Sequence, residues 1–127
     1  MNRKLYPLCE NHLYLKAYRK GKTAVNKYTA VYILKNYKKT PDGSLPLTRL
    51  GLAVNRKLGK ACKRNRVKRI IREGYRENLP RIKDGYIIVI AARGAAFNKN
   101  VKSTLIAEKL FESITKLLLN IGALYIF

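Results

Sequence analysis

The sequence predicts a small α+β fold in which residues 1–127 form a single domain. Three stretches carry apolar residues at helical spacing, and β-branched or aromatic segments separated by turn residues lie between them. A chain of 127 residues with 47% hydrophobic residues can bury one core, but not two. The expected order is helix, two or three strands, helix, strand, helix, an αβββαβα-type sandwich whose helices cover one face of the sheet.

The first helix is expected over residues 11–20. Asn11 suits an N-cap, and Gly21 is a typical residue at the end of a helix. Tyr14 and Tyr18 lie one turn apart on this helix, so they share one side of it. That spacing is compatible with packing in the core and with a binding surface, and both interpretations stay open at this point.

Two strands are expected next, over residues 28–37 and 47–54. The turn residues at 41–43, Pro-Asp-Gly, predict a hairpin that pairs these strands antiparallel. In the second strand, Gly51 and Ala53 leave one face nearly bare, so another group can approach the sheet there.

The C-terminal half contains a strand and a helix. The apolar run over residues 85–92 predicts a central strand that is covered on both faces. From about residue 101 a last helix is expected, and its apolar positions recur at helical spacing. The predicted inward positions of this helix are Leu105, Ile106, Leu110, Ile114, Leu117, Leu118 and Ile121.

The most distinctive stretch is residues 55–76, where a helix is expected from about Lys60 to Asn78. Ten Lys or Arg residues lie between Arg56 and Arg76, and the nearby acids are only Glu73 and Glu77. One helix face is apolar, with Val67, Ile70, Ile71 and Tyr75. At 100° per residue the opposite face presents Asn65, Arg66, Arg69, Arg72 and Arg76.

A net charge of +21 indicates a polyanionic partner. Neutralising a phosphate backbone releases counterions, so this composition favours nucleic acid binding at low salt. A membrane is not expected as the partner, because no apolar run reaches the ~18 residues of a spanning helix. The N-terminus carries no signal-peptide pattern, so a cytoplasmic location is expected. DNA is not expected either, because no helix-turn-helix pattern is present.

The residues that catalysis would need are missing. The seven acids form no metal-ligand motif, His12 is the only histidine, and no phosphate-binding glycine loop is present. Cys9 and Cys62 lack a zinc-type spacing and are expected to be free, packed cysteines. Arginines suit phosphates and tyrosines suit unpaired bases, so the sequence indicates an RNA-binding protein that is not catalytic alone.

The segment from Gly51 to Tyr75, G-L-A-V-N-R-K-L-G-K-A-C-K-R-N-R-V-K-R-I-I-R-E-G-Y, resembles the bacterial ribonuclease P protein component. The hallmark R-N-R followed by K-R-x-I-R is matched by Arg64, Asn65, Arg66, Lys68, Arg69 and Arg72. The family's first helix is also matched, through Tyr14, Tyr18, Arg19, Lys20 and Gly21.

The resemblance implies an accessory subunit of an endoribonuclease that removes the 5′ leader from precursor tRNA. Its implied partners are a catalytic RNA subunit and the precursor tRNA. In this family the RNA performs the hydrolysis with Mg²⁺ that is held mainly by RNA, and no metal site is expected on the protein. The resemblance also implies a left-handed βαβ crossover, whereas general rules favour a right-handed one.

The resemblance assigns two sets of site residues. Contacts to the catalytic RNA are implied for Arg56, Lys57, Lys60, Arg64, Asn65, Arg66, Lys68, Arg69, Arg72 and Arg76. A leader-binding cleft between the first helix and the sheet is implied for Tyr14, Tyr18, Lys20, Ala30 and Tyr32. Ala53 and the pair Asn55-Arg56 depart from the residues usual in the family at those positions.

The alternative is a structural ribosomal protein, because some ribosomal RNA-binding proteins have a similar fold and charge. A ribosomal protein would not need tyrosines in a row beside the sheet, nor the R-N-R helix in this context. The presence of both features favours the ribonuclease P subunit.

Overall fold

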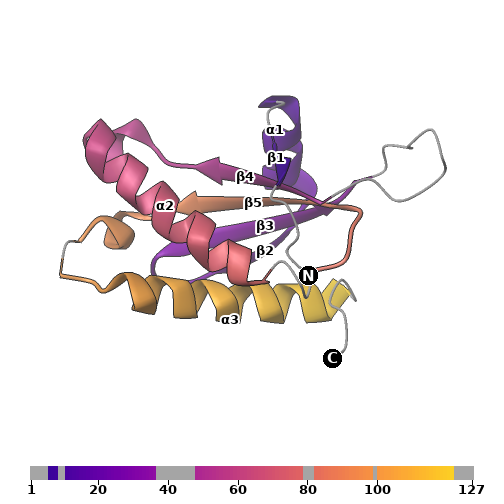
Figure 1. Cartoon of the computed structure of the whole chain (residues 1–127). Helices are drawn as coiled ribbons and strands as arrows, with labels where there is room; N and C mark the ends of the chain where they lie inside the picture. The colour runs from indigo at the N-terminus through magenta and orange to yellow at the C-terminus, as the bar shows by residue number, and fades with distance from the viewer. Residues whose placement is uncertain (1–5, 9–10, 37–47, 79–81, 99, 122–127) are drawn as a thin grey trace.

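The computed structural model describes residues 6–8, 11–36, 48–78, 82–98 and 100–121 (Figure 1). One mixed sheet has the strand order β1-β4-β5-β3-β2. The strands are β1 (Tyr6–Pro7), β2 (Lys22–Val25), β3 (Thr29–Lys35), β4 (Arg49–Ala53) and β5 (Tyr86–Ala92). The α-helices are α1 (Asn11–Lys20), α2 (Ala61–Asn78) and α3 (Ser103–Ile121), with short 3-10 turns η1 (Arg56–Leu58) and η3 (Gly94–Phe97).

Strand β5 is the centre of the sheet, as its apolar run predicts. It pairs antiparallel with β3 and parallel with β4. Ile88 and Ile90 are buried against α2 and α3, while Ile87 and Val89 are buried in a second cluster on the opposite face. Both faces of this strand are therefore covered.

The predicted hairpin between the first two long strands is wrong. β5 lies between β3 and β4, so these strands run in opposite directions without pairing. The physical reason is burial, since the most apolar segment of the chain takes the position that water cannot reach from either side. The predicted turn at residues 41–43 lies outside the described residues.

The connection from β4 through α2 to β5 is a left-handed crossover, as the resemblance implies. In Figure 1, α2 lies in front of the sheet, β4 lies above β5, and both strands point to the left. If the view is rotated so that both strands point upward, with α2 still in front, β5 lies to the left of β4. In the usual right-handed crossover the second strand would lie to the right.

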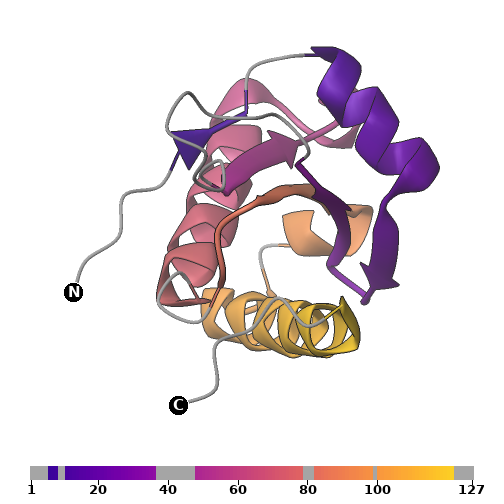
Figure 2. The same ribbon diagram turned by 90° about the vertical axis from the view of Figure 1, so that its right-hand side faces the viewer.

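The helices cover both faces of the sheet, which corrects the expectation that they cover one. Helices α2 and α3 pack on one face, and Figure 2 shows α1 on the other. The larger core cluster joins the α2 and α3 side chains to Val31, Ile33 and Leu50 of the sheet. The smaller cluster contains Leu8 and Ala17 and is packed by Leu13, Tyr14, Tyr32 and Leu34.

Helix boundaries follow the sequence prediction, but two other features do not. The predicted αβββαβα order is confirmed, but no residue range was predicted for β2, because four residues carry too little periodicity to locate it. Leu105 was predicted to face inward, yet it is exposed, whereas Ile106 is buried. Adjacent residues of a helix differ by about 100° in direction, and the buried positions Leu110, Ile114 and Leu117 place the centre of the apolar face nearer to Ile106 than to Leu105.

Asn26 joins the turn between β2 and β3 to α3. Its Nδ2 donates to Thr29 Oγ1 at 2.8 Å, to Ser113 Oγ at 2.8 Å and to the Lys109 carbonyl at 3.3 Å. Its Oδ1 accepts from the backbone N–H groups of Tyr28 and Thr29 at 2.8 and 2.9 Å. One amide side chain thus connects segments that are more than 80 residues apart in sequence.

We predict that Asn26→Ala lowers the free energy of unfolding by about 2–3 kcal/mol, because it leaves several partly buried groups without partners. Urea denaturation of the free protein at constant ionic strength measures this loss. The matched control is Asn98→Ala, which removes a single exposed hydrogen bond to Asn100 N. Equal losses for the two variants would contradict the role of Asn26.

Candidate nucleic-acid interface

The polar face of α2 and the segment before it form a basic surface. The exposed members of the predicted set are Arg56, Lys57, Lys60, Asn65, Arg66, Arg69, Arg72 and Arg76. Within the described ranges, none of the Arg and Lys side chains among them forms an ion pair with a carboxylate. Their charge is therefore available to an external anion. Lys63 is exposed on the same helix and extends the set, although the family motif did not point to it.

Arg64 and Lys68 differ from the rest of the basic surface, because they are half-buried. The Nε of Arg64 is buried and has no hydrogen-bond partner among the described residues. A buried donor without a partner costs free energy, and a ligand that reaches it would remove that cost.

The basic residues before α2 are held by a short 3-10 turn. Asn55 caps this turn, since its Oδ1 accepts from the Lys57 N–H at 2.9 Å. The cap places Arg56 and Lys57 directly after the end of β4, at one end of the sheet. The departure from the family at Asn55-Arg56 therefore keeps both a capping side chain and a positive charge.

Tyr18 of α1 and Tyr32 of β3 form an aromatic pair on the opposite face of the sheet. Their ring centroids are 4.9 Å apart and the rings meet edge to face at 78°. Tyr18 is 40% exposed and Tyr32 is half-buried, so the pair has surface left for another ring to stack on. Partial burial, with the charges of Tyr32 and Tyr14 as smaller causes, raises the pKa of Tyr18 above its ordinary value of 10.0.

Tyr14 is placed differently, although it also comes from α1. Its hydroxyl donates to the Leu8 carbonyl at 3.1 Å, and its ring lies against Gly51 of β4. A Cβ on Gly51 would lie 2.7 Å from three atoms of the Tyr14 side chain. The group that approaches the bare face of β4 is therefore a side chain of the protein itself.

A row of three alanines lies beside the tyrosines on the face of the sheet that carries α1. The strand register aligns Ala30, Ala91 and Ala53 across β3, β5 and β4, with Val25 of β2 at the edge, and we call the three alanines the alanine strip. The adjacent row contains Tyr32 and Gly51, which α1 covers. The sequence prediction found Ala30 but missed Ala91, because only the register between strands reveals that the two are neighbours.

The predicted cleft residues are therefore brought together in part. Ala30 and Tyr32 share one face of β3, Tyr18 contacts Tyr32, and Lys20 is exposed at the end of α1. Tyr14 lies one turn nearer the start of α1, against Gly51 of β4. The basic residues of η1 follow Ala53 by only a few positions, so positive charge borders the strip at the end of β4.

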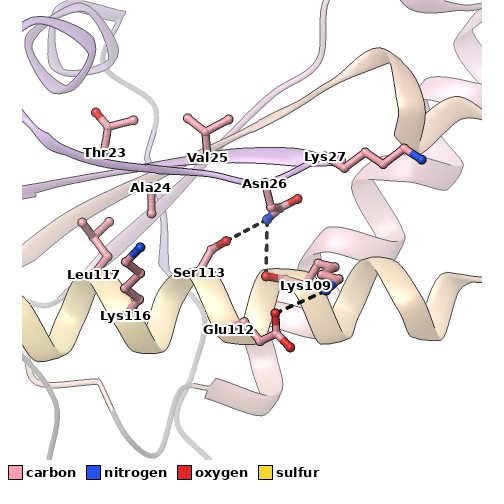
Figure 3. A pocket seen from close by; sticks show the side chains of 10 residues that line it. All are labelled: Thr23, Ala24, Val25, Asn26, Lys27, Lys109, Glu112, Ser113, Lys116 and Leu117. Carbon is pink, nitrogen blue, oxygen red and sulfur yellow. Dashed lines mark hydrogen bonds and ion pairs between the residues drawn. The ribbon is translucent and has the colours of Figure 1, made fainter.

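A separate groove of about 540 Å³ lies between β2 and α3 (Figure 3). Its lining comes from the edge strand and the turn after it, and from one side of α3. Lys109 and Glu112 form an ion pair of 3.5 Å there, beside the hydrogen bonds of Asn26. No residue of the predicted RNA-binding or leader-binding sets lines this groove. It lies where the edge of the sheet packs against α3.

The acidic residues, cysteines and histidine of the described part of the chain do not form a metal site. No set of three His, Cys, Asp or Glu side chains there could hold a metal ion. Cys62 is exposed, which corrects the expectation that it is packed, and Cys9 lies outside the described residues. His12 is exposed at the start of α1. None of the described helices has the length and apolar character that a membrane span requires.

Comparisons with known proteins agree with this geometry. The family model described as Ribonuclease P matches residues 2–118. The ribonuclease P protein component of Clostridioides difficile is 47% identical over 61% of this chain and 63% of its own length. That of Symbiobacterium thermophilum is 41% identical over 76% and 78%. The RNase P protein from Thermotoga maritima superposes with a TM-score of 0.69 at 32% identity, covering 87% of this chain and 94% of that one.

We predict that Tyr18 ionises later than an ordinary tyrosine. A raised folded-state pKa means that the folded protein holds this proton more tightly, so stability is lost only as pH rises from about 10 through the folded pKa. Ultraviolet titration of wild type minus Tyr18→Phe isolates the group. A difference curve centred at or below pH 10 would contradict the environment described for Tyr18.

Proposed function

This chain belongs to the ribonuclease P protein family, and from that premise we propose that it is the protein subunit of a tRNA-processing ribonucleoprotein. It binds the catalytic RNA with α2 and the 5′ leader of precursor tRNA with the cleft beside α1. The observation that carries the proposal is the separation of an unpaired basic face from an exposed aromatic pair on opposite faces of one sheet.

Helix α2 suits a folded RNA because its contacts are of the kind that phosphates accept. The guanidinium groups of Arg66, Arg69 and Arg72 are exposed, and such groups make paired hydrogen bonds to phosphate oxygens. Contacts to phosphates position a protein without reading bases. The predicted set, extended by Lys63, therefore serves as an electrostatic dock for the RNA subunit.

The cleft beside α1 suits a single strand. Tyr18 and Tyr32 leave part of their rings exposed, and aromatic rings stack on unpaired bases of any sequence. The alanine strip lets a flat base or a sugar approach the sheet closely. The basic residues of η1, which follow the end of β4, and Lys20 at the end of α1 supply positive charge for the phosphates of the same strand.

We assign no catalytic role to the protein side chains. The described residues lack a carboxylate cluster for Mg²⁺, whose preferred ligands are oxygens, so they do not fit a metal-dependent hydrolytic centre. The RNA subunit therefore supplies the reaction and holds the magnesium ions, and the protein increases the affinity for a substrate that carries a leader. The proposed substrate places this activity in the cytoplasm.

We predict that Arg66→Ala weakens binding to the catalytic RNA and lowers the slope of log K against log salt by about one unit. The reason is the loss of one phosphate contact and its released counterion. Binding titrations at several salt concentrations give the slope. Lys116→Ala, an exposed cation on α3, is the control and should leave the slope unchanged. A slope that Arg66→Ala leaves intact would argue against a phosphate contact.

We predict that Tyr18→Ala weakens holoenzyme binding to precursor tRNA by about 1–3 kcal/mol and leaves mature tRNA binding unchanged. Only the precursor has a leader base to stack on the ring. Leu15→Ala, on the exposed side of the same helix, is the matched control. If both substrates lose the same affinity, the cleft does not bind the leader.

A further inference from the structure

The two tyrosines of α1 have different surroundings, even though they are one helical turn apart. Tyr14 is half-buried, its ring contacts Gly51, and its hydroxyl is bonded to the Leu8 carbonyl. Tyr18 is 40% exposed and meets Tyr32 edge to face. Part of the Tyr18 ring is therefore open to a ligand, whereas the Tyr14 ring is packed against the protein itself.

Two contacts of Tyr14 lead to β4. Leu8 is tied to this strand, because its N–H donates to the Leu50 carbonyl at 2.8 Å. Gly51 is the next residue of the strand, and the Tyr14 ring fills the space where its side chain would lie. Tyr14 therefore fixes α1 to β4 at two neighbouring points, one apolar and one polar.

The other end of α1 runs through Gly21 directly into β2, which pairs with β3 and places Lys22 opposite Ile33. The Gly21 N–H closes the end of the helix, because it donates to the Ala17 carbonyl at 2.9 Å. A Cβ on Gly21 would lie 2.5 Å from the Ala17 carbonyl oxygen and 3.0 Å from that of Ile33. Because the two ends of α1 are held by different strands, contacts outside the Tyr18–Tyr32 pair help to set the height of Tyr18 above Tyr32.

We propose that Tyr14 is a positioning residue, which holds α1 on β4 so that Tyr18 and Tyr32 present their rings at the spacing a leader base needs. Tyr14 does not contact the leader. This assignment rests on the proposed leader-binding function and divides the predicted cleft residues into one that positions and two that bind.

A positioning role and a contact role differ in how they depend on leader length. The reconstituted holoenzyme is titrated with precursor tRNAs whose leaders are shortened one nucleotide at a time, and each nucleotide that is contacted adds a step in affinity. Tyr18→Leu is expected to remove one step, with a loss of about 5- to 100-fold. Tyr14→Leu is expected to reduce that same step and no other.

Two further variants separate the loss of the Tyr14 contact from a general loss of folding. Gly51→Ala keeps Tyr14 but displaces its ring, so it should reduce the same step, and combining it with Tyr14→Leu should add little, because both act on one contact. Tyr14→Phe keeps the ring, loses the bond to Leu8 and should have a smaller effect than Tyr14→Leu. Circular dichroism verifies folding, and Leu15→Ala should leave every step unchanged.

The outcomes separate the two claims. If Tyr14→Leu removes a step at a different nucleotide from Tyr18→Leu, Tyr14 contacts the leader and the positioning role is overturned. If Tyr14→Leu leaves the Tyr18 step at full size, the positioning role is also overturned, while the leader-binding function stands. If Tyr18→Leu removes no step at all, the leader-binding function itself is wrong, and the role of Tyr14 falls with it.

Discussion

The structure depends on the packing of one side of α2 against the sheet and α3. The other side of that helix carries a density of positive charge that repels itself, and only burial holds it in place. Val67, Ile71 and Tyr75 are at most 1% exposed. Each buried side chain of this size contributes roughly 1.5–3 kcal/mol, whereas exposed charges are screened by solvent and salt. The core can therefore maintain a surface that would otherwise weaken the helix.

The same packing sets where the two surfaces lie. Because α2 and α3 cover one face of the sheet, α1 and its tyrosines must use the other face. β5 connects the two layers, since Ile88 and Ile90 face one cluster while Ile87 and Val89 face the other. A bound RNA on α2 and a single strand beside α1 would then not compete for the same side chains. They would approach each other at the end of β4, where the alanine strip meets the basic residues before α2.

Local patterns in the sequence predicted most of this structure, and long-range contacts account for what they missed. The exposed face of α2 followed from helical spacing, and its C-terminal end followed from Pro80, which cannot continue a helix. The pairing of β3 with β4 was predicted wrongly. A turn signal between two strands does not show whether a strand from later in the sequence, here β5, will lie between them in the sheet. Likewise, two tyrosines at equivalent positions look alike in sequence. Tyr14 and Tyr18 differ only in what lies beneath them, a glycine in one case and Tyr32 in the other.

The central claim is that this protein supports leader removal performed by an RNA, and reconstitution tests it most directly. The purified chain, a cognate catalytic RNA and precursor tRNA are combined at low Mg²⁺, and release of the 5′ leader is followed over time. The account predicts cleavage with both components together and none with either alone under these conditions. Leader release by the protein alone, or no gain when the protein is added to the RNA, would contradict it.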